Sequence, residues 1–263
     1  MSVHQSSDST PLLSVVVITR NEADRIGRLL ASVTFADEVV VVDSGSTDDT
    51  VRICRAAGAK VVHRDWQGYA EQKQAALELG SGEWILNLDA DEAISDLSAT
   101  EIFLAIAKAP SDAVGFSMPR LSRYLNRWIR HGGWYPDRKV RLVRRAMGKW
   151  IGEGIHERLE VSGRVLELKQ PILHYVYRSI SDQVRTINSF STLTAEHAGR
   201  AGTRLYLLYG LLHAVGKFLE CAVWKMGFLD GMAGLVIAVN SSFYVFLKHA
   251  KTWEKSLPRD DSQ

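Results

Sequence analysis

Four short apolar runs alternate with helix-patterned segments over the first hundred residues of this 263-residue chain. The runs at residues 13–19 (LSVVVIT) and 38–42 are rich in β-branched side chains, which is typical of strands covered on both faces of a parallel sheet. Two further runs, at 60–63 and 84–88, are separated by a helical pattern at 69–79. Strands that alternate with helices across short loops predict an α/β fold, with a doubly wound, mostly parallel sheet flanked by helices.

The last of these apolar runs ends in three carboxylates, Asp89, Asp91 and Glu92. Carboxylates at the mouth of a buried strand repel one another unless a cation or hydrogen-bond donors neutralise them. Hard oxygen ligands at such a place suit Mg²⁺ or Mn²⁺ carrying a phosphorylated substrate. Taken alone, the same residues also fit a polar turn that ends the strand.

Polar side chains follow the other strands as well, and ligands of open α/β sheets bind at the carboxyl ends of the strands. Ser46 and Asp49 have the spacing of a helix capping box after the second strand. The convergence favours a ligand site over a turn. The absence of GxGxxG and GxxxxGK[ST] patterns disfavours a dinucleotide-binding domain and a P-loop. The candidates at the strand ends are Thr19, Asn21, Glu22, Asp43, Asp89 and Asp91.

Three segments of the first hundred residues, VVVITRNEADRIGRLLASV, VVVVDSGSTDDT and ILNLDADE, resemble in their order and spacing the family 2 glycosyltransferases of the GT-A fold. The resemblance implies inverting transfer of a sugar from a nucleotide diphosphate sugar, with Mg²⁺ or Mn²⁺ as cofactor. It implies that Thr19, Asn21, Glu22 and Asp43 hold the nucleoside. It assigns Asp89 and Asp91 to the ribose and to the metal that bridges the diphosphate. Lys73 lies in a segment that matches a pocket-lining helix of the family; a solvated helix face is the alternative.

Residues 120–149 differ in character from the rest, because they hold ten lysines and arginines against one acid, Asp137, with aromatic residues between them. The whole chain carries a formal charge of only +2, so this local excess is more informative than the total. Such a segment suits nucleic acid, a phosphate-bearing acceptor or an anionic membrane surface. Beside a sugar-nucleotide site we expect the second or third and no nucleic acid. A solvated edge with structural tryptophans is the alternative.

The segments GGWYPDRKVRLVRR and GKWIGEGIHERL resemble a narrower group, the bacterial transferases that add a hexose to the inner core of lipopolysaccharide. The resemblance favours glucose from UDP-glucose as the transferred sugar. His156 and Glu157 are similar in position to the acidic motif that supplies the catalytic base in many GT-A enzymes. Glu157 is therefore the predicted base, His156 would orient the base or the acceptor, and Asp137 is a rival base. His174 would complete the metal site or serve as a core histidine.

The chain is expected to be helical from residue 181 onward, and residues 205–216 and 231–247 carry no formal charge. A membrane-spanning helix needs about 20 mostly apolar residues. We therefore expect helices that lie on the membrane or dip into it. A helical cap that packs on the sheet or dimerises is the alternative.

This organisation predicts a disordered lead-in at 1–11, a catalytic domain at 12–178 and a helical region at 179–263. The catalytic domain divides into a nucleotide-sugar half (12–110) and an acceptor half (111–178). The lead-in lacks the apolar core of a signal peptide, and the two cysteines lack metal-site spacing, which indicates a reducing compartment.

We expect a peripheral protein at the cytoplasmic face of the bacterial inner membrane, acting on a lipid-linked glycan such as the lipopolysaccharide core. Two other functions fit less well. A sugar nucleotidyltransferase would open with a glycine-rich loop, which residues 19–22 (TRNE) lack. A non-catalytic, membrane-associated protein that binds a nucleotide sugar has no need of Asp89, Asp91 and Glu157 together.

Overall fold

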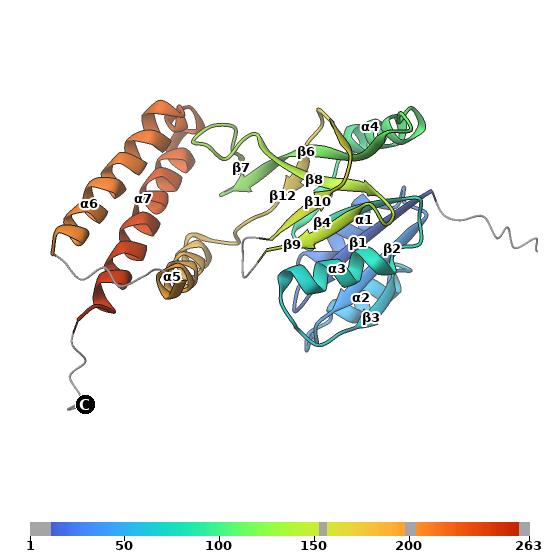
Figure 1. Ribbon diagram of the computed structural model, residues 1–263, viewed down its shortest axis with the longest axis horizontal. Helices are drawn as coiled ribbons and strands as arrows, with labels where there is room; N and C mark the ends of the chain where they lie inside the picture. Colours follow the sequence, from blue (N-terminus) through green and yellow to red (C-terminus); the bar gives the residue numbers. More distant parts are fainter. Residues whose placement is uncertain (1–11, 153–156, 198–203, 258–263) are drawn as a thin grey trace, which may run out of the picture. The chain divides into compact units, whose positions relative to one another are not determined.

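The structure is a computed structural model that describes residues 12–152, 157–197 and 204–257 (Figure 1). The described chain forms two compact units. Unit 1 runs through Arg120 and continues with Arg138–His174, and unit 2 consists of Leu121–Asp137 and the chain from Tyr175 onward. Residues 121–137, which we expected in the acceptor half of the catalytic domain, therefore group with the C-terminal helices.

The first four strands of unit 1 form a parallel sheet in the order β3-β2-β1-β4. Thr19 pairs with Asp43, and Ile18 pairs with Asp89. The parallel arrangement predicted for this part of the chain is confirmed, and the polar strand ends lie at one edge. The strands are β1 (Leu13–Thr19), β2 (Glu38–Asp43), β3 (Lys60–His63) and β4 (Trp84–Asp89).

Helices cover both faces of this sheet, as alternation along each strand requires. Leu13 and Val15 of β1 pack into a core that includes residues of α1, α2 and α4, whereas Val16 packs with Ala76 and Leu77 of α3. The two apolar clusters fix the sheet between its helices and hold the carboxyl ends of β1, β2 and β4 in register. The helices are α1 (Ile26–Ser32), α2 (Thr50–Ala56), α3 (Tyr69–Leu79) and α4 (Asp96–Ala107).

The second half of the chain extends the sheet in the order β4-β8-β6-β12-β5 and makes it mixed. β8 (Asp137–Arg144) runs antiparallel to β4, and β12 (Ile172–His174) runs antiparallel to β5 (Glu92–Ile94), which places His174 opposite Glu92. These pairings bring new side chains to the end of β4. The other strands are β6 (Ala113–Tyr124), β7 (Arg127–Trp128), β9 (Gly148–Ile151), β10 (Arg158–Val161) and β11 (Arg164–Glu167).

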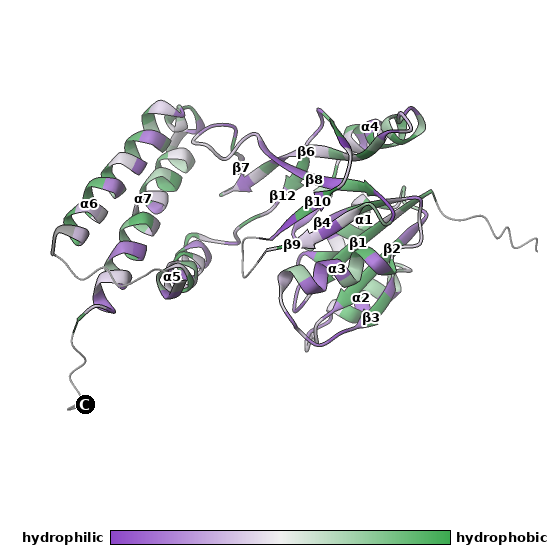
Figure 2. Ribbon diagram, viewed as in Figure 1, coloured by the Kyte–Doolittle hydropathy of each residue, from purple (hydrophilic) through white to green (hydrophobic). Residues whose placement is uncertain are grey.

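Unit 2 is built on three helices: α5 (Ile180–His197), α6 (Arg204–Leu219) and α7 (Gly231–Glu254). α7 packs against both α5 and α6. A π-helical turn at Glu220–Trp224 and a 3₁₀ turn at Gly227–Asp230 join α6 to α7 into a hairpin. Figure 2 shows apolar residues along these helices as well as along the sheet of unit 1.

Candidate active site

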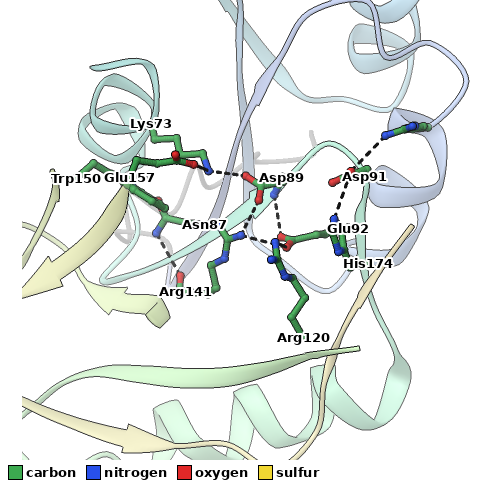
Figure 3. Close-up of polar contacts among 11 residues, drawn as sticks. Lys73, Asn87, Asp89, Asp91, Glu92, Arg120, Arg141, Trp150, Glu157 and His174 are labelled. Carbon is green, nitrogen blue, oxygen red and sulfur yellow. Dashed lines mark hydrogen bonds and ion pairs between the residues drawn. The ribbon is translucent and has the colours of Figure 1, made fainter. Parts of the chain in front are cut away.

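The two aspartates that end β4 have different partners (Figure 3). The carboxylate of Asp89 lies 2.8 Å from Lys73 Nζ through Oδ1 and accepts a 2.6 Å hydrogen bond from Arg141 through Oδ2. Asp91 Oδ2 lies 3.2 Å from an Arg25 nitrogen and 3.5 Å from Nε2 of His174. Both oxygens of Asp89 are thus held by cations, while Asp91 faces an arginine and an imidazole.

Lys73 connects two carboxylates that are distant in sequence. It lies on the sheet-facing side of α3, and its side chain is 10% exposed. Its Nζ donates a 2.8 Å hydrogen bond to Glu157 Oε1 and lies 4.7 Å from the centre of the Trp150 ring. A largely desolvated lysine is stable in such a place because two carboxylates and an aromatic face compensate its charge. Lys73 therefore belongs to the polar cluster at the end of β4 and not to a solvated helix face.

Arg141 is buried in the middle of the site. Its guanidinium reaches Asp89 and also donates a 3.1 Å hydrogen bond to Glu92 Oε1. The main chain of Arg141 is fixed as well, because its carbonyl oxygen accepts a bond from the buried Asn87 side chain, which in turn accepts from Trp150 Nε1. A buried cation with this many partners orders the end of β4 against β8.

The charged groups of this cluster shift one another's pKa values. Burial by itself would raise the pKa of the Asp89 carboxyl, but Arg141 and Lys73 outweigh burial and hold that pKa well below its ordinary value. Burial likewise opposes protonation of Arg141, and Asp89 and Glu92 raise its pKa. Asp89 is therefore an anion, and Arg141 a cation, throughout the physiological range.

Glu92, the third carboxylate of the acidic stretch, has a structural place. Its side chain is fully buried, and Oε2 accepts a 2.9 Å hydrogen bond from the main-chain nitrogen of Asp89. Oε1 faces Arg141 and, at 3.6 Å, Arg120. The Glu92 carboxylate thus closes the turn after β4 by bonding back to the main chain of Asp89.

The predicted nucleoside residues line the same edge of the sheet. Asp43 accepts hydrogen bonds from the main-chain nitrogens of Gly45 and Ser46, at 3.0 and 2.9 Å. Asn21, in a left-handed conformation, accepts a 2.8 Å bond from the Thr47 nitrogen and joins the loops after β1 and β2. Glu22 follows in the first of these loops, where its main-chain nitrogen donates to a threonine hydroxyl of α2.

Two further features of this edge concern the Thr19 hydroxyl and the start of α2. The hydroxyl of Thr19 is buried and has no hydrogen-bond partner among the described residues, which leaves a polar group for a ligand to satisfy. The expected capping box at Ser46 and Asp49 is wrong. Asp49 is the N-cap residue but forms no side-chain cap bond, and the Ser46 hydroxyl donates to Asp43 instead.

The side chains at Asp91 suit a divalent cation whose remaining ligands come from a substrate. In the described part of the chain, no three acidic, histidine or cysteine side chains group as a metal site. Asp91 and His174 nevertheless offer one carboxylate oxygen and one imidazole nitrogen 3.5 Å apart. Mg²⁺ in particular is commonly held by one or two carboxylates plus substrate phosphates. Asp89, with both oxygens paired, is a poorer ligand than its neighbour.

The structure describes one of the two other predicted catalytic residues. His156 lies outside the described residues. Asp137 is the first residue of β8, four residues before Arg141, and it groups with unit 2.

Sequence reasoning did not single out Arg25, Trp150 and Arg141, which the structure brings to this cluster. Only Arg141 carries a local signal, because it interrupts the short apolar run of Val140, Leu142 and Val143 within β8.

Comparison with known proteins identifies the family. The profile of "Glycosyl transferase family 2" matches residues 14–158, which is more than half of the chain. The chain belongs to glycosyl transferase family 2. It is thus a glycosyltransferase, and the family match includes the strands that carry Thr19, Asp43 and Asp89 as well as Lys73 and Glu157.

Relatives within the family extend over almost the whole chain. The chain is 29% identical over 254 residues to the lipopolysaccharide core biosynthesis glycosyltransferase LpsC of Rhizobium meliloti, covering 92% of each protein. It is 32% identical to an uncharacterised glycosyltransferase of Rickettsia bellii, covering 94% of this chain and 88% of the relative.

Solved structures show the same fold. The mannosyltransferase PcManGT of Pyrobaculum calidifontis, solved with GDP-Man and Mn²⁺, has a TM-score of 0.53 at 17% identity and covers 94% of this chain and 89% of its own. Glucosyl-3-phosphoglycerate synthase of Mycobacterium tuberculosis has a TM-score of 0.51 at 17% identity and covers 73% of this chain and 83% of its own. The expected GT-A fold is confirmed, although its sheet, which we expected to be mostly parallel, is mixed.

Proposed function

We propose that this glycosyltransferase is inverting and metal-dependent, and that it moves a hexose from a nucleotide diphosphate sugar to a lipid-linked glycan. The observation that carries the proposal is the cluster at the end of β4, where Lys73 lies 2.8 Å from both Asp89 and Glu157. It joins the acidic stretch to Glu157, the last residue of the sequence GEGIHE, so the proposed donor-binding and base groups share one edge of the sheet.

The donor would lie across the carboxyl ends of β1, β2 and β4. Thr19, Asn21, Glu22 and Asp43 would hold the nucleoside, with the buried Thr19 hydroxyl as an unsatisfied partner for it. Asp89, fixed by Lys73 and Arg141, would accept from the ribose. The Mn²⁺ and GDP-Man in the PcManGT complex agree with this assignment of donor and metal classes.

Asp91 and His174 would hold Mg²⁺ or Mn²⁺ together with the donor diphosphate. When bound, such a cation stabilises the negative charge that develops on the leaving diphosphate. Arg25 and Arg120 stand beside Asp91 and Glu92, where they balance charge around the diphosphate. All these residues belong to unit 1.

Glu157 would act as the general base. Its carboxylate removes the proton of the acceptor hydroxyl, and the hydroxyl oxygen attacks the anomeric carbon from the side opposite the diphosphate, which inverts the configuration. Lys73 would position Glu157 for this step. His156 would orient Glu157 or the acceptor, and Asp137 remains the rival base.

The acceptor class follows from the relatives. LpsC is named for lipopolysaccharide core biosynthesis, and we assign this chain an inner-core or related lipid-linked acceptor. Glucose from UDP-glucose is the favoured donor. Two helices are apolar and long enough to cross a membrane, and we place the enzyme peripherally at the cytoplasmic face of the bacterial inner membrane, without a nucleic-acid partner.

The direct test is incubation of the full chain with labelled nucleotide sugars, Mn²⁺ and truncated lipopolysaccharide. We expect label to move from a UDP-hexose to the glycan, with UDP released and the anomeric configuration inverted. Transfer from GDP-mannose but from no UDP-hexose would correct the donor. Tight donor binding with no transfer to any truncated core would contradict the proposed acceptor class.

A further inference from the structure

The α6–α7 hairpin of unit 2 carries large apolar side chains on its outside. Trp224, at the turn, is 85% exposed, and Met232, at the start of α7, is 74% exposed. Soluble monomeric proteins rarely expose continuous apolar faces of this kind, so the face has a partner. The exposed residues recur at helical spacing, as Leu208, Leu212, Val215 and Leu219 on α6 and as Met232, Leu235, Val239 and Phe243 on α7.

A bilayer could contact this hairpin in two ways. Tyr206–Trp224 and Gly227–Glu254 are long and apolar enough to cross a membrane, and only 22% and 33% of their apolar windows are buried. The hairpin could therefore cross the bilayer, or it could lie in the plane of the interface with its outer face in contact with lipid. The polar contacts of the hairpin decide between these arrangements.

The turn of the hairpin is bonded to residues 121–137. Asp230, which is buried, accepts hydrogen bonds from the main-chain nitrogens of Arg130 and His131, at 3.0 and 2.8 Å. Arg127 donates a 3.1 Å bond to the carbonyl oxygen of Leu229. An arginine-rich, hydrogen-bonded segment thus fixes one end of the hairpin.

The middle and the open end of the hairpin are bonded to α5. The buried side chain of Gln183 accepts hydrogen bonds from Asn240 of α7 and, at 2.5 Å, from the hydroxyl of Tyr124. Near the end of α7, Lys251 donates a 2.6 Å bond to the carbonyl oxygen of Asn188, and Lys255 donates a 3.1 Å bond to that of Ala195. α5 therefore runs beside α7 from its middle to its end.

These hydrogen bonds are incompatible with a hairpin that crosses the bilayer. If α6 and α7 spanned the bilayer, α5 would lie at the depth of the acyl chains, although its exposed side includes Arg185, Asn188 and Glu196. Charged groups facing lipid at that depth are strongly disfavoured. We infer that the α6–α7 hairpin lies in the plane of the membrane interface, with its exposed apolar stripes in the lipid and both its ends on the same side.

The charge around the hairpin indicates which lipids it meets. Residues 204–257 hold six lysines and arginines against three acids, and residues 121–137 hold three arginines against one acid. Two of the acids, Glu220 and Asp230, are ion-paired within unit 2. An excess of cations beside an apolar face suits anionic phospholipid headgroups. The inference goes beyond the proposed transfer reaction and can be tested without it, because lipid binding needs no substrate.

The first test measures binding of the full-length protein to sedimenting vesicles of phosphatidylcholine with and without phosphatidylglycerol. We expect Leu212→Glu and Met232→Glu each to lower the affinity for anionic vesicles at least tenfold, because both side chains lie on the exposed stripes. The matched control is Ser189→Glu, which adds the same charge to the exposed side of α5 and should leave the affinity unchanged. Unchanged binding in both stripe variants would overturn the inference.

The second test asks whether the two ends lie on one side. Asn126→Cys reports on the segment bonded to the turn, and Ser256→Cys reports on the end of α7; the native Cys54 and Cys221 are both buried. With protein bound to the outside of sealed vesicles, a membrane-impermeant maleimide should modify both introduced cysteines. Modification of only one of them, with full modification after detergent is added, would show a crossing hairpin and overturn the in-plane arrangement.

A second copy of the chain is the competing occupant of the apolar face. Light scattering of the native mass, in the absence of lipid, separates the two cases. A dimer that Leu212→Glu converts to a monomer, with vesicle binding unchanged, would assign the face to the second copy and overturn the inference. Loss of vesicle binding with no change in mass would support it, whatever the outcome of the transfer assay.

Discussion

The two compact units differ in how many large apolar side chains their elements leave exposed. In unit 1 most apolar side chains of β1, β2 and β4 are buried, and charged side chains gather at the carboxyl edge of the sheet. In unit 2 several polar side chains are buried, Gln183, Asp230 and Asn240 among them, while leucine, methionine, phenylalanine and tryptophan lie outside.

The difference shows that burial has a separate meaning in each unit. Unit 1 has its apolar side chains inside, as expected of a domain in water, so its buried charges need an explanation, and the proposed reaction supplies one. The lipid contact inferred for unit 2 would explain why its buried polar groups bond to one another while apolar side chains face outward. Two questions follow: whether the buried polar residues of unit 1 serve the reaction, and whether the exposed apolar residues of unit 2 contribute little to the free energy of unfolding.

The largest expected effect is loss of activity in Asp91→Ala. The substitution removes the carboxylate that would hold the metal with His174, and we expect turnover to fall by roughly 10³-fold or more, because metal stabilisation of the leaving group is worth several kcal/mol. The assay is transfer of labelled hexose with Mn²⁺ present. Asp96→Ala, an exposed acid at the start of α4, is the control and should keep normal activity. Asp91→Ala turnover at the normal rate with a chelator present would remove the metal from the proposal.

A matched pair of leucines tests the opposite packing of the units. Leu86 of β4 is fully buried, whereas Leu212 of α6 is 64% exposed. Leu86→Ala should lower the free energy of unfolding by about 3 kcal/mol, the scale of a core cavity. Leu212→Ala should change it by less than about 0.5 kcal/mol in aqueous buffer. Denaturant titration measures both, and a large loss in Leu212→Ala would mean that its face is covered in the free protein.

Glu157→Gln tests the base. Without a group that accepts the proton, turnover should fall by roughly 10²-fold, and donor affinity should be retained. Glu160→Gln is the control, because Glu160 is exposed and pairs only with Arg158 in the described contacts. A normal rate in Glu157→Gln together with an inactive Asp137→Asn would transfer the role to Asp137.

The smallest expected effect concerns acid stability. The pKa of Asp89 is held well below its ordinary value of 3.8, so the folded state binds its proton more weakly than the unfolded state does. The resulting stability is fully present above the unfolded pKa and is lost as the pH falls toward the folded pKa. Lys73→Met removes one of the two cations, so the pKa should rise and the contribution should shrink.

The measurement for Lys73→Met is the free energy of unfolding between about pH 6 and pH 3, read against the unfolded pKa of aspartate near 3.9. The variant should show a weaker pH dependence in the acid range than the parent. Lys149→Met, which removes an exposed lysine of β9 beside Trp150, should leave the pH profile unchanged. An unaltered profile in Lys73→Met would mean that Arg141 alone holds the Asp89 carboxylate.

Local sequence patterns were enough to place the elements of the first hundred residues. The bounds predicted at 13–19, 60–63 and 69–79 coincide with β1, β3 and α3. Side-chain periodicity and glycine breaks act within a few residues, so they can be recognised without knowing the rest of the fold. The same patterns predicted which polar residues follow the strands, because parallel strands bring their carboxyl ends to one edge.

The pairing of charges at that edge was decided by the tertiary structure. The sequence placed Asp89 and Asp91 together at a site for ribose and metal, and only the antiparallel pairing of β8 with β4 brings Arg141 to Asp89 from 52 residues away. The contact of Lys73 with Glu157 joins residues 84 apart. A carboxylate near a buried strand end forms an ion pair with the cation that the tertiary structure places beside it, because desolvation makes an unpaired buried charge unfavourable.

For the C-terminal helices as well, the sequence determined one part of the arrangement and the tertiary structure decided the rest. By itself, the sequence determined that two apolar segments follow residue 204 and that they are flanked by lysines, because composition and length are local properties. Only the tertiary structure decided which faces of these helices remain exposed and that α5 and residues 121–137 are bonded along the hairpin. Helix faces are assigned by the packing of neighbouring helices, and that packing depends on side chains that are far apart in the sequence.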